Sequence, residues 1–125
     1  MVKKILTVDD SQTIRSIIKQ VLKGYKCEIL EAASGDEGLE MTQNENPDLI
    51  ILDIDMPGMN GLEMLMKVRN DDAIMNIPVI MLTSKAKPQN IRIAKELGIL
   101  AFLSKPFKRS MLIEKISSVF ELPPA

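Results

Sequence analysis

Five short apolar runs in this sequence each end at residues from which a binding site can be built. The run ends are Asp9-Asp10, Ala33-Ser34, Asp53, Thr83 and Lys105, and four of them, at Asp9-Asp10, Asp53, Thr83 and Lys105, carry the groups from which the site would be built. If the runs are parallel strands, their carboxyl ends open on one edge of a sheet, and these side chains converge in one crevice. The crevice would hold three carboxylates, a hydroxyl and an ammonium.

The three carboxylates, those of Asp9, Asp10 and Asp53, predict a cation site. Carboxylates a few ångströms apart raise one another's pKa, so a divalent metal would compensate them. An all-oxygen ligand set favours Mg²⁺ or Mn²⁺ over zinc or copper, and the chain has no histidine for imidazole ligation or for Ser-His-Asp catalysis. Taken alone, Asp9-Asp10 could equally be acids that favour the start of a helix.

Thr83 and Lys105 would complete the site with groups that can bind an anion next to the metal. By itself Thr83 could be a strand-end hydroxyl bonded to backbone, and Lys105 could be a solvated lysine. Lys105-Pro106 is less ordinary, since an X-Pro bond permits the cis form, which would direct the ammonium back into the crevice. A carboxylate nucleophile, a metal cage, a hydroxyl donor and a counter-charge together suit formation of an aspartyl phosphate.

The elements that must position these residues alternate between strands and helices. Apolar runs predict strands near 4–8, 28–32, 49–52, 78–82 and 101–103, and apolar residues at helical spacing separate them. The pattern predicts an α/β fold, with a single doubly wound, five-stranded parallel sheet between two helix layers. For Asp9 and Asp53 to share a site, the first and third strands must be neighbours. We therefore adopt the known strand order 2-1-3-4-5, which satisfies this condition.

Length and composition limit the chain to one domain and one broad class. The chain has 125 residues, 46% of them hydrophobic, and a net charge of −1, so no overall field favours nucleic acid or an anionic membrane. We expect one folded domain at residues 1–121 and a frayed tail or the start of a linker at 122–125. The single cysteine, Cys27, and the absence of an apolar run long enough to span a membrane favour a cytoplasmic protein.

The motifs as a set resemble the receiver domain of bacterial two-component response regulators, over residues 3–121. The matching residues are Val8-Asp9-Asp10-Ser11, Asp53 with Met56-Pro57-Gly58-Met59-Asn60-Gly61, Thr83-Ser84 and Lys105-Pro106-Phe107. The resemblance implies a flavodoxin-like, CheY-like fold and a signalling switch. It implies no enzyme activity apart from magnesium-dependent self-phosphorylation and self-dephosphorylation at Asp53.

The resemblance also implies a role for each site residue. Asp53 would accept a phosphoryl group from a sensor histidine kinase or from a small donor such as acetyl phosphate. Asp9, Asp10, Asp53 and the Asp55 backbone carbonyl would hold Mg²⁺, for which Mn²⁺ could substitute. Thr83 and Lys105 would contact the phosphoryl group. Phe102 matches an aromatic that turns inward with the threonine and remodels the face of the fourth helix, fifth strand and fifth helix, although it could also be a core side chain.

The implied partners are proteins. The stretch from Asp9 to Arg15 looks most like stand-alone regulators of chemotaxis or motility, so we expect a cytoplasmic monomer that binds a kinase and a downstream target, without direct contact to nucleic acid or membrane. Residues 1–72 carry a net charge of −6 and residues 73–125 a net charge of +5. We therefore expect the basic half to favour an acidic target, through Lys87, Arg92, Lys95, Lys108 and Arg109.

Two further readings stay open from the sequence. Asp53-Ile54-Asp55 looks like the Asp-x-Asp of haloacid-dehalogenase-type phosphatases, in which Asp55 would be the general acid, although the chain has no acids after Lys105 at the spacing of that family. Alternatively, the chain is the receiver part of a larger regulator with an output domain. Within the receiver reading, we expect Asp55 and Lys85 to pair across the mouth of the site and to change the lifetime of the phosphate.

Overall fold

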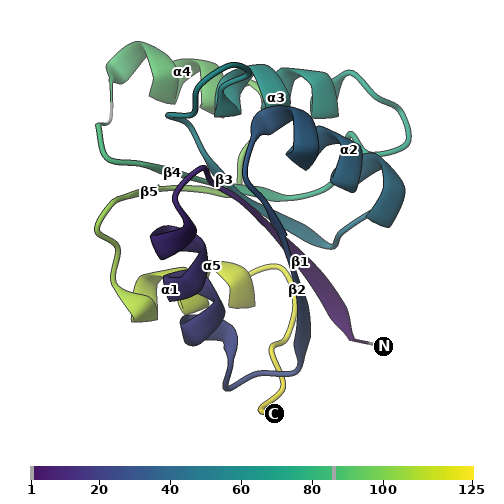
Figure 1. The fold of residues 1–125 in the computed structure, drawn as a ribbon, viewed down its shortest axis with the longest axis vertical. Coiled ribbons are helices and arrows are strands. Elements are labelled where there is room, and N and C mark those ends of the chain that lie inside the picture. The colour runs from purple at the N-terminus through teal and green to yellow at the C-terminus, as the bar shows by residue number, and fades with distance from the viewer. Residues whose placement is uncertain (1, 86) are drawn as a thin grey trace.

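Five strands alternate with five helices in the computed structural model, which describes residues 2–85 and 87–125 (Figure 1). The alternation predicted from the sequence is confirmed. The strands are β1 (Lys3–Val8), β2 (Cys27–Ala32), β3 (Leu49–Asp53), β4 (Val79–Thr83) and β5 (Ala101–Ser104), and the helices are α1 (Gln12–Leu22), α2 (Gly35–Glu45), α3 (Gly61–Arg69), α4 (Pro88–Glu96) and α5 (Arg109–Ser117).

The strands form one parallel sheet in the order β2-β1-β3-β4-β5, which confirms the expected order. Val8 pairs with Leu52, and Asp53 pairs with Leu82. The register therefore brings the carboxyl ends of β1, β3 and β4 to one edge of the sheet, where the chain leaves β1 and β3 toward opposite faces. This is the position at which doubly wound sheets bind ligands.

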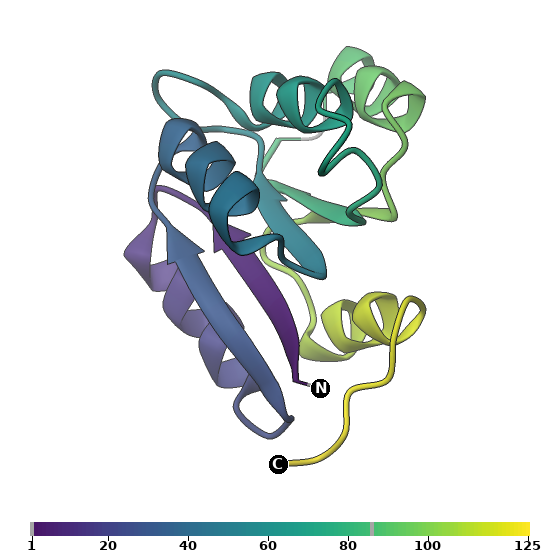
Figure 2. The same cartoon turned by 90° about the vertical axis from the view of Figure 1, so that its right-hand side faces the viewer.

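Two helix layers cover the sheet, with α1 and α5 on one face and α2, α3 and α4 on the other (Figures 1 and 2). Every residue of β3 and β4 is buried, as expected for central strands covered on both faces. Alternate residues of β3 enter different cores: Ile51 packs in the cluster under α1 and α5, and Ile50 in the cluster under α3 and α4. No helix in the described residues combines the length and hydropathy of a membrane span.

Local side-chain bonds fix where the helices near the sheet edge begin. Ser11 caps α1 by accepting a hydrogen bond from Ile14 N at 3.3 Å. Asn60 and Glu63, whose spacing in the sequence predicts a cap, form a full reciprocal capping box at the start of α3. At α2 the same Ser-x-x-Glu pattern forms only half of a capping box. The Ser34 hydroxyl accepts a hydrogen bond from Glu37 N. The Glu37 carboxylate instead accepts from Ala33 N.

Three apolar residues whose helical spacing in the sequence predicts a buried position lie outward instead. Ile17 of α1 is 44% exposed because it lies at the margin of the apolar stripe that Ile18 and Val21 centre on the sheet. Met66 of α3 is 46% exposed, since Met64, Leu65 and Val68 form the buried face of that helix. Val119, 39% exposed, lies beyond the end of α5. In α3, apolar residues occur on several sides of the helix, so spacing alone gave the wrong face.

The tail at residues 122–125, expected either to fray or to begin a linker, packs against the domain in this structure. Leu122 is buried with the α1–α5 core. Lys26 N donates to Pro123 O at 2.7 Å, and Ala125 N donates to Gly24 O at 2.9 Å. Two prolines prevent a helix but leave carbonyl groups that the loop between α1 and β2 can use. The sequence also predicts Gly24 as the C-terminal cap of α1, but this is wrong, because Lys23 ends that helix in a right-handed conformation.

Candidate functional site

The acids predicted to form a cluster do lie together at the sheet edge. Asp9 and Asp10 follow β1, and Asp53 is the last residue of β3. One oxygen from each of the three carboxylates lies within 4.8 Å of the others. Asp9 and Asp53 are buried, whereas Asp10 is exposed. The cluster is therefore open to solvent on one side and closed by the sheet on the other.

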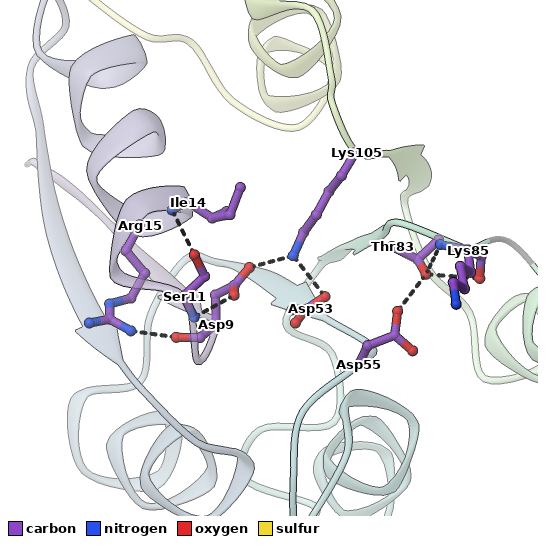
Figure 3. A network of polar contacts seen from close by, with 9 residues as sticks. All are labelled: Asp9, Ser11, Ile14, Arg15, Asp53, Asp55, Thr83, Lys85 and Lys105. Carbon is purple, nitrogen blue, oxygen red and sulfur yellow. Dashed lines mark hydrogen bonds and ion pairs between the residues drawn. The ribbon is translucent and has the colours of Figure 1, made fainter.

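Lys105 lies between the two buried acids (Figure 3). Its Nζ atom is 2.8 Å from Asp9 Oδ2 and 3.0 Å from Asp53 Oδ1, and the Lys105-Pro106 bond is cis. The lysine approaches from the end of β5, although β4 separates β5 from β3 in the sheet. One ammonium thus partly balances two carboxylates that are almost fully buried, which leaves a residual negative charge.

The pKa of Asp53 reflects this balance. The pKa of the Asp53 carboxyl is raised from 3.8 to about 6 as the net result of three influences: burial, the largest, raises it, the Lys105 ammonium lowers it, and the charge of Asp9 raises it. Burial by itself lowers the pKa of Lys105, but the hydrogen bond to Asp9 and the charge of Asp53 outweigh it, so the pKa of Lys105 is raised. At neutral pH the lysine is therefore charged and Asp53 is mostly an anion.

A divalent cation fits the donor atoms that these acids present. The Lys105–Asp53 ion pair lacks hydrogen-bond geometry, so the buried Asp53 Oδ1 has no hydrogen-bond donor among the described residues. A buried oxygen without a donor is costly unless another group satisfies it. Three carboxylates with one exposed member match the preference of Mg²⁺ for a few carboxylates and several waters. The residues therefore fit Mg²⁺.

Backbone contacts hold the acids in place. Asp9 Oδ1 accepts a hydrogen bond from Ser11 N at 2.9 Å, and the Arg15 guanidinium donates to the Asp9 carbonyl. Gly61 packs directly against Asp53: a Cβ atom at Gly61 would lie 2.2 Å from the Asp53 carbonyl oxygen. Only glycine permits this approach. The sequence showed Gly61 within a turn-rich motif but did not reveal this contact, because it depends on how α3 packs on β3.

Thr83 lies on the other side of the site, fully buried at the end of β4. Its Oγ1 atom is 3.0 Å from Asp55 Oδ2 and 3.0 Å from the Lys85 carbonyl oxygen, and it accepts a hydrogen bond from Lys85 N at 3.1 Å (Figure 3). The expected Asp55–Lys85 ion pair does not form within the described part of the chain. The carboxylate of Asp55 instead accepts a hydrogen bond from the Thr83 hydroxyl.

Phe102 lies in β5, where it pairs with Met81 of β4. It is partly buried and packs against the core cluster shared with α3 and α4. The Phe102 side chain thus contacts the core and stays partly accessible to solvent. Both interpretations offered by the sequence, a core side chain and an aromatic with a second position to occupy, fit this placement.

Comparison with known proteins identifies the class that this fold and site define. The response regulator receiver domain family matches residues 5–117, and the chain belongs to that family. The chemotaxis protein CheY of Pseudomonas aeruginosa is 40% identical over 120 residues, which cover 94% of this chain and 96% of that protein. Chemotaxis protein CheY-3 of Vibrio cholerae is 37% identical over 120 residues, covering 94% and 92%.

Solved structures agree with the sequence comparison. Chemotaxis protein CheY4 of Vibrio cholerae superposes with a TM-score of 0.88 at 33% identity, covering 96% of this chain and 100% of that one. A CheY-like response regulator receiver domain protein of Methanospirillum hungatei gives a TM-score of 0.88 at 34% identity, covering 94% and 93%. The chain is therefore a CheY-like receiver domain and not a haloacid-dehalogenase-type phosphatase.

Proposed function

We propose that this receiver is a phosphorylation-dependent switch in a two-component relay, with Asp53 as the phosphoacceptor and residues 1–121 as the switching unit. The donor would be a sensor histidine kinase or a small acyl phosphate such as acetyl phosphate. The observation that carries this proposal is the position of Asp53. It is a buried carboxylate at a strand end, 3.0 Å from the Lys105 ammonium and within 4.8 Å of two further acids.

The proposed chemistry is a simple displacement at phosphorus. One Asp53 carboxylate oxygen forms the new bond to phosphorus, and the bond between phosphorus and the donor's histidine nitrogen or acetate oxygen breaks, with its electron pair leaving on the donor. Because Asp53 is mostly ionised at neutral pH, the nucleophile is ready without a general base. Lys105, already 3.0 Å from Asp53, would pair with an oxygen of the transferred group.

Asp9, Asp10, Asp53 and the Asp55 backbone carbonyl would hold Mg²⁺ or Mn²⁺. When bound, the metal supplies positive charge that neutralises the acids and the incoming phosphoryl oxygens. The protein's own contribution is to hold the carboxylate oxygens of the acids in fixed positions. Ser11 N fixes one oxygen of Asp9, and Lys105 fixes the other at 2.8 Å.

The switch would act through Thr83 and Phe102. A phosphoryl group on Asp53 offers Thr83 Oγ1 an acceptor that exists in one state only, and only such a difference in contacts shifts a conformational equilibrium. Movement of Thr83 would let Phe102, now partly buried, turn further inward. The face formed by α4, β5 and α5 would change as a result.

The target would be an acidic protein surface in chemotaxis or motility, and the switch would work as a monomer in the cytoplasm. Likeness to chemotaxis proteins supports the pathway. Five basic side chains on α4 and at the start of α5 support the acidic partner, since all are exposed: Lys87, Arg92, Lys95, Lys108 and Arg109. Reversing several of these charges should weaken target binding, and unchanged affinity would reject this part of the proposal.

Asp55 and Lys85 would tune the lifetime of the phosphate. Both are exposed beside Thr83, at the open side of the site where a hydrolytic water would approach. Asp55→Asn and Lys85→Ala should each change the rate of dephosphorylation, measured as loss of the phosphorylated mass after removal of the donor. Equal rates in both variants and the wild type would contradict this role.

Intact mass spectrometry tests the proposed phosphoacceptor. Incubation with Mg²⁺ and acetyl phosphate should add one phosphoryl group, which hydroxylamine removes as expected of an acyl phosphate. The Asp53→Asn variant should remain unlabelled. Labelling that persists in this variant, or an adduct that resists hydroxylamine, would overturn the assignment of Asp53.

A further inference from the structure

The threonine that would report phosphorylation is already bonded to an acid of the same site. Thr83 Oγ1 lies 3.0 Å from Asp55 Oδ2 (Figure 3). Thr83 is fully buried and Asp55 is exposed, so the carboxylate reaches inward from the surface to the hydroxyl. The only other acceptor within reach among the described residues is the Lys85 carbonyl oxygen, also at 3.0 Å.

The hydroxyl has a single proton, so it can serve only one strong acceptor at a time. A carboxylate forms a shorter and stronger hydrogen bond with a hydroxyl than a peptide carbonyl does. Asp55 is therefore the better acceptor in the structure as it stands. A phosphoryl group on Asp53 would require the same proton, and Asp55 would have to release it.

Nothing in the described residues neutralises the Asp55 side chain in this arrangement. Lys85 is its sequence-expected partner, yet no Asp55–Lys85 ion pair is present among those residues, and Lys85 contacts Thr83 through its backbone. The α4 helix begins at Pro88, and its N-cap residue, Lys87, makes no side-chain capping bond. Lys85, which lies between β4 and α4, is bonded to Thr83 through its backbone N–H and carbonyl groups.

We propose that Asp55 is a positioning residue that holds Thr83 in the resting conformation and so opposes activation of the switch. This inference rests on the proposed function, because the competing acceptor is a phosphoryl group on Asp53. The Asp55–Thr83 bond exists only before that group arrives, so it stabilises one of the two states. Removing the Asp55 carboxylate should shift the equilibrium toward the active conformation.

A double-mutant cycle separates this role from simple charge repulsion. The ligand is beryllofluoride with Mg²⁺, a stand-in for a phosphoryl group on a carboxylate, and its apparent Kd is measured by calorimetry. Asp55→Ala should tighten binding about tenfold, the change expected from losing one charge-assisted hydrogen bond of the resting state. Asp55→Asn should fall between, since an amide oxygen still accepts a proton but carries no charge.

The same substitutions in a Thr83→Val background decide the matter. Without the Thr83 hydroxyl, the Asp55 carboxylate has no hydrogen bond to this side chain. Asp55→Ala should then change the Kd for beryllofluoride by less than about twofold. An equal gain in both backgrounds would show repulsion alone and overturn the inference, as would no gain when Thr83 is present. If wild-type protein fails to bind beryllofluoride, the proposed function itself fails, which is a different result.

Discussion

The two sides of the site differ in how firmly they are held. On the acid side, Asp9 and Asp53 are almost fully buried, and a backbone N–H, a lysine and a tight glycine contact fix them. On the threonine side, Thr83 is buried but its acceptor, Asp55, is exposed, and the helix that follows has no side-chain cap. Under the proposed function, the firmly held acid side would position the chemistry and the threonine side would respond to it.

The far end of α4 sharpens this comparison. Arg69 of α3 donates to Leu97 O and Gly98 O, both at 2.8 Å, and to Ile77 O at 2.9 Å. Burial lowers the pKa of this guanidinium, yet it stays charged against the carbonyl groups at the C-terminus of α4. α4 is thus tied by a side chain of α3 at its C-terminal end, whereas its N-cap residue, Lys87, makes no side-chain capping bond.

The largest effect should come from removing Lys105 on the acid side. Lys105→Met would leave two buried carboxylates without a cation. The free energy of unfolding in EDTA should fall by about 3–5 kcal/mol, the usual cost of breaking a buried pair. Urea denaturation measures this loss, and Mg²⁺ should restore part of it because it supplies the missing charge.

Lys108→Met is the matched control for that experiment. Lys108 is exposed and has no ion pair among the described residues, so its loss should change the free energy of unfolding by less than about 0.5 kcal/mol. Equal losses in the two variants would show that the acid side does not depend on the Lys105 ammonium.

The pH dependence of stability should expose the charge on Asp53. Since its pKa is raised from 3.8 to about 6 on folding, the native state binds the proton more tightly, and metal-free stability falls as pH rises through that window. The loss attributable to Asp53 should approach about 3 kcal/mol at pH 7.

Asp53→Asn isolates that contribution. The variant should match the wild type near pH 4 and exceed it at pH 7, with the gap opening between those values. The gap should shrink when Mg²⁺ is present. The free energy of unfolding is measured by urea denaturation in EDTA. A difference between variant and wild type that stays constant across this pH range would mean that the charge on Asp53 does not destabilise the folded state.

On the threonine side, the largest loss should come from Arg69→Met. The variant loses hydrogen bonds to four carbonyl groups, those of Met75, Ile77, Leu97 and Gly98, and should lose about 2–3 kcal/mol of stability. Lys67→Met, an exposed change on the same helix, is the control. Labelling of Asp53 should persist in the folded Arg69 variant, since the acid side is unchanged. Loss of labelling would show that the two sides are not separable.

The smallest effect should come from Ser11→Ala, which removes the cap of α1 next to Asp9. A lost N-cap costs about 1 kcal/mol. Ser16→Ala, an exposed change inside α1, should be neutral or slightly stabilising by urea denaturation. A larger loss at Ser16 than at Ser11 would contradict the capping contact.

The sequence predicted the strands, the helices and the residues of the acid side because these follow from local rules, whereas the strand order was adopted from a known fold. Apolar runs ending at Asp9, Asp53 and Thr83 define strands, and parallel strands bring their ends together whatever the details of packing. Helix faces were less predictable: Met66 and Ile17 have helical spacing but lie outward, because apolar residues occur on more than one side of a helix.

The remaining errors concern contacts between segments far apart in sequence. The tail packs on the loop at Gly24 through backbone hydrogen bonds, which residue types do not reveal. Asp55 bonds to Thr83 and not to Lys85, since the relative position of two strand ends decides between two plausible partners. The Arg69 contacts are likewise invisible, because four carbonyl acceptors carry no sequence signal.

The rate at which acetyl phosphate labels Asp53, measured by intact mass at increasing Mg²⁺, tests the central claim most directly. If a cation must bridge the acids before Asp53 can accept a phosphoryl group, labelling should be negligible in EDTA and should saturate with Mg²⁺. It should require more Mg²⁺ in Asp10→Asn, which removes the exposed acid of the cluster. Labelling at the same rate in EDTA, or an unchanged Mg²⁺ requirement in that variant, would contradict the claim.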